Sequence, residues 1–391
     1  MKGGLFQVVI AVVLTTLGSC SGKNPSGLTS IRIDPKDSQS LMLSEFFEEI
    51  NYVFLDDSDS LPLVNPYKIS FKSDLILVSD NVMDNIHIFN DSGNRHITLK
   101  SLGQGPMEFS HIEDFFVHGD SIIIKDNVLK KLLFFDLKGQ VLGEQKFKLQ
   151  SAEFFYHPFF RIYYLENNEA YNFAKIDYKG NILERYYQVD QNILGFKLLS
   201  NHGFQKDSFR NLIFFNIPYT YHVAIFDELG KMVKVLEFDF GAANISSSQH
   251  ARLGRGYEKR NFVEQHQLVE MITCFFPFRS GYFVFFIQGN KVWHFVWLDN
   301  DFTVIQQVKS FKNDLDLMKI RTIPWSYDEE SVVFMTRSID LYNDFKEREN
   351  EIRTNYPSSQ IISFYEKYKE KLKEDKTVLV KLKIHSNLNT E

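Results

Sequence analysis

Basic and aromatic side chains alternate between Gln249 and Phe262, a combination suited to binding an anion or a sugar. Arginine forms paired hydrogen bonds with carboxylates and phosphates, and an aromatic ring offers a flat face for stacking. The side chains concerned are Arg252, Arg255, Tyr257, Lys259 and Arg260. Because long loops on a rigid scaffold commonly carry binding sites, we expect a loop here that binds a glycan, a peptide or an envelope protein. A solvated basic loop is the alternative interpretation.

A second set of polar side chains lies in loops that we expect to enter the innermost strands of a repeated sheet. The set is His111, Glu113, Asp114, His157, Arg161, Asp207, Arg210 and Asn211. If the sheets surround a common axis, such loops meet at a central funnel. The candidates for a ligand site there are His111, Asp114, His157 and Arg210. An enzyme is the alternative, such as a metal-dependent lactonase or hydrolase, or a glycan lyase. Its side chains would converge on a metal, and changing Asp114 or His157 would abolish activity without unfolding the protein.

Several familiar chemical motifs are incomplete or missing. Gly103-Gln104-Gly105-Pro106 lacks the Lys-Ser/Thr pair and the following helix of a phosphate loop. Asp56-Asp57-Ser58-Asp59-Ser60 lacks the central Gly and the final Glu of an EF-hand calcium loop. The 11 histidines show no zinc-site spacing, and the Gly-x-Ser-x-Gly nucleophile motif does not occur. We therefore assign no catalytic residue, and we expect neither a cofactor nor a metal.

One element recurs along the body of the chain: an apolar strand ending in Asp or Asn, a short turn with Gly, and another strand. Asp or Asn caps such a hairpin turn, and Gly takes the positive φ that the turn needs. Four clear copies end at Gly93, Gly139, Gly180 and Gly230, and a degenerate fifth runs from Trp297 to Asp301. Their spacing of about 40 to 50 residues matches one four-stranded propeller blade.

Six such units predict an all-β fold, a six-bladed β-propeller. They are Tyr67–Leu99, Asp114–Phe147, Ala152–Val189, Gly203–Phe240, Val269–Ser310, and a sixth that combines Ser331–Thr336 with Val378–Ile384. A propeller must close its ring, so we expect the N-terminal strand Tyr52–Leu55 to pair with Val378–Ile384 in the last blade.

The sixth unit contains a charged insertion, about residues 343–376, that we expect to be helical. Its apolar side chains follow three- and four-residue spacings, which predicts a helix packed against a blade. They are Ile361, Phe364, Tyr365, Tyr368 and Leu372. A partner-binding helix is the alternative.

The N-terminus has the features of an export signal. Lys2 precedes an apolar stretch, Leu5 to Leu17, that is too short to span a bilayer. The following Gly18-Ser19-Cys20 completes a sequence that resembles the bacterial lipobox, in which cleavage precedes a Cys that carries lipid. We expect a signal peptide at 1–19, a lipidated Cys20 with a tether to residue 29, and a propeller at 30–391. An ordinary cleaved signal peptide is the alternative.

Composition bounds the partners. Apolar residues make up 44% of the 391-residue chain, enough for a large core, and 38 residues are Phe. The net charge of −6 shows no basic excess, so we expect no nucleic-acid partner.

The lipid would attach the protein to a membrane. No acidic run follows Cys20, which favours the periplasmic side of the outer membrane. Cys274, in an apolar run, is expected to be a small buried hydrophobe.

Three segments resemble the six-bladed β-propeller lipoproteins common in Bacteroidota. They are Ser44–Ile50, Leu102–Phe109, and the closing helix followed by Val378–Ile384. Met107 stands where that family usually has another Gly. The resemblance covers nearly the whole mature chain, and it implies the fold and export without implying a shared reaction. Together with the residues above, it predicts a binding or scaffolding protein of the cell envelope, with a propeller-type enzyme as the alternative.

Overall fold

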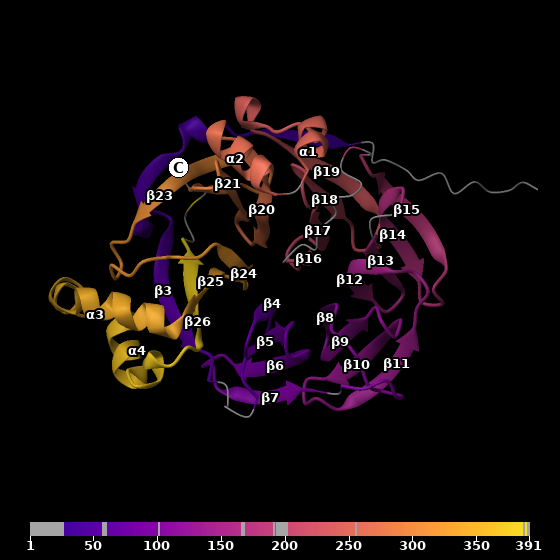
Figure 1. The fold of residues 1–391 in the computed structure, drawn as a ribbon, viewed down its shortest axis with the longest axis horizontal. Coiled ribbons are helices and arrows are strands. Elements are labelled where there is room, and N and C mark those ends of the chain that lie inside the picture. The colour runs from indigo at the N-terminus through magenta and orange to yellow at the C-terminus, as the bar shows by residue number, and fades with distance from the viewer. Residues whose placement is uncertain are drawn as a thin grey trace, which may run out of the picture.

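The computed structural model shows six β-sheets arranged around a central axis, so the predicted all-β, six-bladed propeller is confirmed (Figure 1). The structure describes residues 27–56, 61–100, 102–165, 169–190, 192, 202–254, 256–385 and 388. The expected signal peptide, Cys20 and most of the tether lie outside the described residues, as does Arg255.

Blades one to three are four-stranded antiparallel sheets made from consecutive strands. Blade one contains β4 (Pro66–Lys72), β5 (Leu75–Asp80), β6 (Asn85–Asn90) and β7 (Arg95–Leu99). Blade two contains β8 (Asp114–His118), β9 (Ser121–Asp126), β10 (Lys131–Asp136) and β11 (Val141–Lys146). Blade three contains β12 (Ser151–His157), β13 (Phe160–Leu165), β14 (Tyr171–Asp177) and β15 (Ile182–Gln188). These strands lie within a residue or two of the predicted units.

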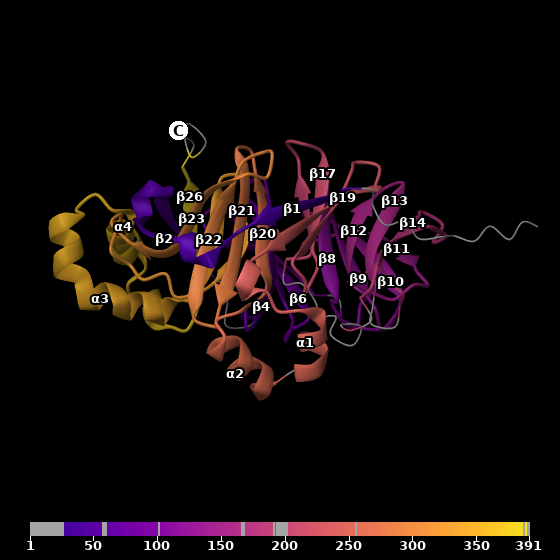
Figure 2. The ribbon, with the colours of Figure 1, turned by 90° about the horizontal axis from the view of Figure 1, so that it is seen from above.

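Blades four and five each carry a fifth strand that the sequence did not predict. Blade four contains β16 (Phe204–Asp207), β17 (Leu212–Asn216), β18 (His222–Phe226) and β19 (Met232–Asp239). Blade five contains β20 (Val269–Phe278), β21 (Gly281–Gln288), β22 (Val292–Leu298) and β23 (Val304–Lys312). β1 (Leu28–Arg32) pairs in parallel with β19, and β2 (Gln39–Met42) pairs in parallel with β23. The N-terminal segment therefore wraps around the outside of two blades (Figure 2).

Blade six takes its outermost strand from the N-terminal part of the chain, which confirms the predicted ring closure. Its order is β24 (Pro324–Tyr327), β25 (Ser331–Arg337), β26 (Thr377–Ile384) and β3 (Phe47–Phe54). β3 runs antiparallel to β26, from Phe54 opposite Val378 to Phe47 opposite Ile384, and so begins earlier than predicted. This pairing covers the edge that β26 would otherwise expose.

The recurring Asp-x-x-Gly element forms the hairpin between the third and fourth strands of a blade. In blade two, Oδ1 of Asp136 accepts hydrogen bonds from the amides of Lys138 and Gln140, and Gly139 has a φ of 81°. The equivalent aspartates of blades three and four accept the same pair of bonds. In the degenerate copy of blade five, Phe302 occupies the glycine position with a φ of 66°. The hairpin therefore repeats even where Gly is lost.

The insertion in blade six is helical, as predicted, and it packs against the closing strand. It consists of α3 (Ser338–Asn355), α4 (Gln360–Tyr368) and η5 (Lys371–Lys373). α3 follows β25 directly, so the helices begin before the expected start near residue 343. The ring of Phe364 lies 5.4 Å from that of Tyr52, and the ring of Tyr368 lies 5.0 Å from that of Phe54. The apolar stripe on α4 thus stabilises β3.

The predicted loop between blades four and five is instead two short helices, α1 (Ser247–Leu253) and α2 (Tyr257–Gln265). α1 begins with a capping box, in which the side chains of Ser246 and Gln249 each accept a hydrogen bond from the other's backbone amide. Both helices project from one face of the ring (Figure 2). Among the described residues, no helix is long and apolar enough to cross a bilayer.

Aromatic side chains fill the space between neighbouring blades. Trp297 is fully buried in blade five, with its ring 6.4 Å from that of Phe46 and 5.9 Å from that of Phe278. Cys274 is also fully buried, and burial raises the pKa of its thiol, which confirms its role as a small core residue. The ring contacts place Trp297 between β20 and the segment that leads into β3.

Candidate functional site

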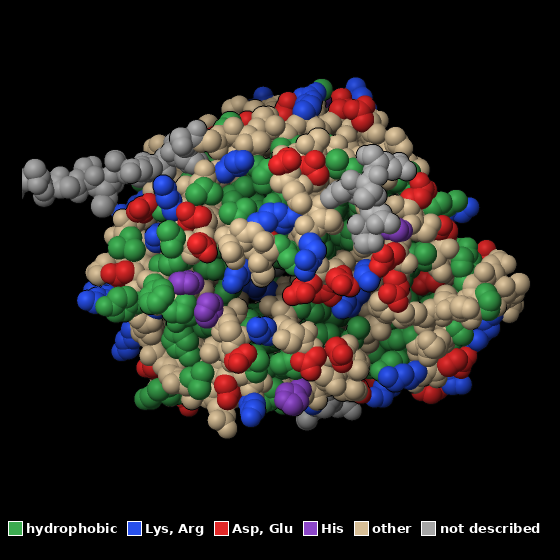
Figure 3. Space-filling view, turned by 180° about the vertical axis from the view of Figure 1, so that it is seen from behind, with side chains coloured by type: hydrophobic (Ala, Val, Ile, Leu, Met, Phe, Trp, Pro, Cys, Tyr) green, Lys and Arg blue, Asp and Glu red, His purple; other side chains and the backbone are tan. Residues whose placement is uncertain are grey.

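A funnel opens at the face of the ring where the inner strands end. β4, β8, β16, β20 and β24 line a cavity of about 730 Å³ there. The cavity is bordered by strand ends such as Lys72, His118 and Tyr327 and by the turns that follow them. Figure 3 shows this face, with lysine and arginine side chains in and beside the central hollow, next to a row of carboxylates.

Four basic side chains lie at the ends of four consecutive inner strands, and we call them the basic arc. They are Lys72 in β4, His118 in β8, His157 in β12 and Lys206 in β16. The rings of His118 and His157 are 5.9 Å apart. Burial lowers the pKa of His118, and repulsion from His157, Lys206 and Lys72 lowers it further. Burial, followed by repulsion from Lys206, also lowers the pKa of His157, so both imidazoles are harder to protonate than a free histidine.

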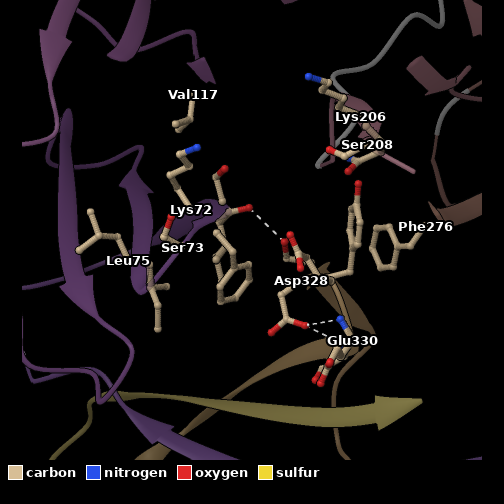
Figure 4. Close-up of a pocket in the computed structure, with 18 of the residues that line it drawn as sticks. Lys72, Ser73, Leu75, Val117, Lys206, Ser208, Phe276, Asp328 and Glu330 are labelled. Carbon is tan, nitrogen blue, oxygen red and sulfur yellow. Dashed lines mark hydrogen bonds between the residues drawn. The ribbon is translucent and has the colours of Figure 1, made fainter. Parts of the chain in front are cut away.

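Carboxylates occupy another wall of the funnel, and the best placed of them are already paired. Asp328 forms an ion pair of 2.6 Å with Lys381, and its side chain also accepts a hydrogen bond from the amide of Glu330. Glu330 lies 3.3 Å from Lys383. Figure 4 shows Asp328 and Glu330 on one strand end, with Lys72 and Lys206 on opposite sides of the cavity. Asp74 and Glu329 also line the cavity.

Aromatic rings provide the apolar surface of the funnel. Phe276 and Tyr327 stack with their ring centroids 4.8 Å apart, and burial raises the pKa of the Tyr327 hydroxyl well above its ordinary range. Phe71, Phe209 and Trp325 line the cavity as well. A ligand here would meet charged groups and flat apolar faces together.

Buried polar contacts hold the strands beneath the funnel. Lys68 Nζ lies 2.7 Å from Asp114 Oδ1, and the other carboxylate oxygen of Asp114 accepts a hydrogen bond from the amide of Phe154. Between the neighbouring blades six and one, the Trp325 indole N–H donates to the carbonyl of Tyr67. Asp114 therefore joins blades one, two and three, and its contacts are those of a structural residue.

Of the four candidate ligand residues, His157 and Arg210 lie at or just after the ends of inner strands, on the funnel face, and none of the four lines the cavity. His157 ends β12 beside His118, whereas Asp114 begins β8 and His111 precedes it, where it contacts Asp84 at 2.7 Å. Arg210 binds Asp207 at 2.6 Å and donates to the carbonyl of Phe278, joining blades four and five. The four candidates therefore do not converge, because His111 and Asp114 lie where an inner strand begins and His157 and Arg210 lie where inner strands end.

The predicted 249–262 site lies on the other face of the propeller. The four strands of a blade alternate in direction, so the connection from an outer strand to the next inner strand lies where inner strands begin. Arg252, Tyr257 and Arg260 are exposed there, but Lys259 is buried and forms an ion pair of 2.5 Å with Glu270. Arg255 lies outside the described residues. None of the described residues of this segment lines the funnel.

A smaller cavity of about 230 Å³ lies beside α1, between blades three and four. Its lining includes Tyr187, Tyr219, His222 and His250. Burial, with repulsion from Lys259, lowers the pKa of His250 to about 4, so this imidazole is neutral near pH 7. The Tyr187 hydroxyl is 2.7 Å from His222 Nδ1.

Sequence reasoning missed Lys72, His118 and Lys206. Each lies at or next to the last residue of an inner strand. Aligning the blades on their Asp-x-x-Gly turns would bring Lys72 and His118 to one position, but not Lys206, which lies further from its turn. Among the described residues, no group of three or more His, Cys, Asp or Glu side chains is arranged to hold a metal ion.

The closed ring with its funnel defines a six-bladed β-propeller. The family described as 6-bladed beta-propeller, DUF5128, matches residues 23–335, and the chain belongs to that family. No curated protein sequence matches the chain.

Similar solved structures include one with the same fold and two with lower structural similarity. A protein of Bacteroides fragilis described as exported has a TM-score of 0.67 at 16% identity, covering 92% of this chain and 100% of its own. A DUF4221 family member from Bacteroides vulgatus has a TM-score of 0.46 at 11% identity, covering 87% and 97%. Virginiamycin B lyase from Staphylococcus aureus has a TM-score of 0.41 at 13% identity, covering 71% and 78%. At these identities the similarity concerns the fold alone.

Proposed function

We propose that the chain is an exported cell-envelope protein that binds a ligand in the funnel. The observation that carries this proposal is the cavity of about 730 Å³, in which charged and aromatic side chains from five blades meet. Ligand sites usually combine a concavity of several hundred Å³ with a few convergent polar groups. The candidate ligands are a glycan, a peptide or a segment of another envelope protein.

The same proposal includes a lipid anchor at Cys20. Its support is the lipobox-like Leu17–Cys20 sequence and the description of the Bacteroides fragilis relative as exported. Several acyl chains on one Cys hold a protein stably at a membrane, whereas one chain binds only marginally. The absence of an acidic run after Cys20 favours the periplasmic face of the outer membrane.

Changing Cys20→Ser is expected to abolish lipid labelling and to release the protein from the membrane fraction. Radiolabelled palmitate fed to expressing cells, followed by fractionation, measures both. Cys274→Ser is the matched control, because that thiol is buried and the label should persist. Label retained by the Cys20 variant would show that the anchor lies elsewhere or is absent.

A ligand of the funnel is expected to raise the melting temperature of the mature chain, residues 21–391, in a concentration-dependent way. At a hundredfold excess over Kd the gain is about 2.7 kcal/mol, which corresponds to a rise of several degrees. The screen contains envelope and dietary glycans, peptides and calcium. Ser70→Trp should abolish the rise, because Ser70 lines the cavity and an indole would fill part of it.

Ser363→Trp is the control for that variant, since Ser363 is exposed on α4 outside the funnel. It should leave the ligand-induced rise unchanged. If Ser70→Trp keeps the rise while its own melting temperature is normal, the ligand binds elsewhere and the proposal fails.

A further inference from the structure

The basic arc forms because the end of the inner strand recurs at a similar place in each successive blade. Lys72, His118 and His157 are each the last residue of an inner strand, and Lys206 is the last but one. Equivalent strand ends on consecutive blades follow one another around the axis, so four separate sequence positions lie along one part of the rim. The same position holds Phe278 in blade five and Tyr327 in blade six, which confines the positive charge to one part of the rim.

The five lysines that line the funnel fall into two groups, those that form an ion pair with a carboxylate and those that do not. Lys68 binds Asp114, Lys381 binds Asp328, and Lys383 binds Glu48 at 2.8 Å. Among the described residues, the ammonium groups of Lys72 and Lys206 lie within ion-pair distance of no carboxylate and donate no hydrogen bond. The two unpaired lysines are the two that belong to the basic arc.

Lys72, His118 and Lys206 all line the cavity, and the positive charge of both lysines acts on the His118 ring. The neighbouring charges that shift the pKa of His118 are all positive, from His157, Lys206 and Lys72, and they oppose its protonation. Repulsion of this kind raises the free energy of the empty folded state, and an anion placed among the groups would relieve it. Oxyanions bind ammonium and imidazolium groups through short, charge-assisted hydrogen bonds.

We propose that the basic arc is an oxyanion subsite, which takes a carboxylate, phosphate or sulfate group of the ligand bound in the funnel. The inference rests on the proposed function, because it names the chemistry of the same site. Lys72 and Lys206 bind the anion from blades one and four, and His118 contacts it from blade two. The aromatic rings of the funnel contact the uncharged part of the ligand.

Titration calorimetry at constant ionic strength tests the subsite with simple probes. Sulfate, inorganic phosphate and citrate are titrated into the mature chain, with glucose as a neutral probe. At least one of the three anions should bind, and the order of their affinities distinguishes sulfate, phosphate and carboxylate ligands. The double variant Lys72→Met, Lys206→Met should weaken that binding by more than about tenfold, because two charge-assisted contacts are lost.

Lys36→Met is the matched control, since Lys36 is exposed between β1 and β2 on the outside of the ring. It should bind the anions as the wild type does. Binding of none of the three anions, or equal binding by the double variant, would overturn the subsite. An uncharged ligand from the thermal screen could still raise the melting temperature of the wild type but not that of Ser70→Trp. In that case the funnel remains the binding site, and only the assignment of an anion subsite is overturned.

Discussion

A chain that begins at residue 56, after the closing strand, is expected to lose its cooperative unfolding transition. Removing residues 27–55 deletes β1, β2 and β3, together with the buried Phe46, Phe47, Phe54 and Leu55. Burial of each such side chain contributes about 1.5–3 kcal/mol, so their sum approaches the 5–15 kcal/mol that stabilises a typical domain. β26 would also be left as an exposed edge, open to aggregation.

A chain that begins at Ser38 is the control for ring closure. It loses β1 but keeps β2 and β3, so only the fifth strand of blade four is missing. It should unfold cooperatively at a lower urea concentration than the full mature chain. Circular dichroism during urea unfolding measures both variants. An unchanged transition in the chain that begins at residue 56 would show that β3 does not hold the ring closed.

Lowering the pH from 7 to 4.5 is expected to reduce the free energy of unfolding by several kcal/mol. Burial is the main cause that lowers the pKa of His202, His250 and His294, each to about 4. In the unfolded chain these groups titrate near pH 6.5, so between pH 6.5 and 4 the unfolded state binds more protons. The contribution of each neutral histidine to the free energy of unfolding is fully present above pH 6.5 and is lost as the pH falls. At pH 4.5 the loss is about 2 kcal/mol per histidine.

His294→Gln isolates one of these contributions. His294 is almost fully buried, with its Nδ1 2.8 Å from the Ser38 hydroxyl, and a neutral amide cannot gain the proton. Urea unfolding at steps between pH 4.5 and 7 should show a shallower pH dependence for this variant. His96→Gln, at an exposed position, should keep the wild-type slope. Equal slopes for His294→Gln and the wild type would contradict the assignment.

Local patterns explain why the blades were predictable from sequence. The Asp-x-x-Gly hairpin is encoded within five residues, so Asp136 and Gly139 specify their turn without help from the rest of the chain. β1 and β2 were missed because they pair in parallel with strands far along the sequence, where no hairpin turn marks the contact. The helices α1 and α2 were missed although the Ser246–Gln249 capping box was readable.

The site was less predictable, because convergence depends on which end of each inner strand a residue occupies. His111 and His157 look alike in sequence, yet one precedes an inner strand and the other ends one. Only the closed ring shows that Lys72, His118 and Lys206 share a face. The basic side chains at 249–262 were obvious in sequence, but the alternating strand directions place them on the opposite face.

Anomalous diffraction from crystals soaked in selenate tests the central claim most directly, because selenate imitates sulfate and selenium can be located without bias. The account predicts the strongest selenium peak within hydrogen-bond distance of Lys72 and Lys206 in the funnel, and its loss in the double variant. Peaks confined to the exposed arginines of α1 and α2, with an empty funnel, would contradict it.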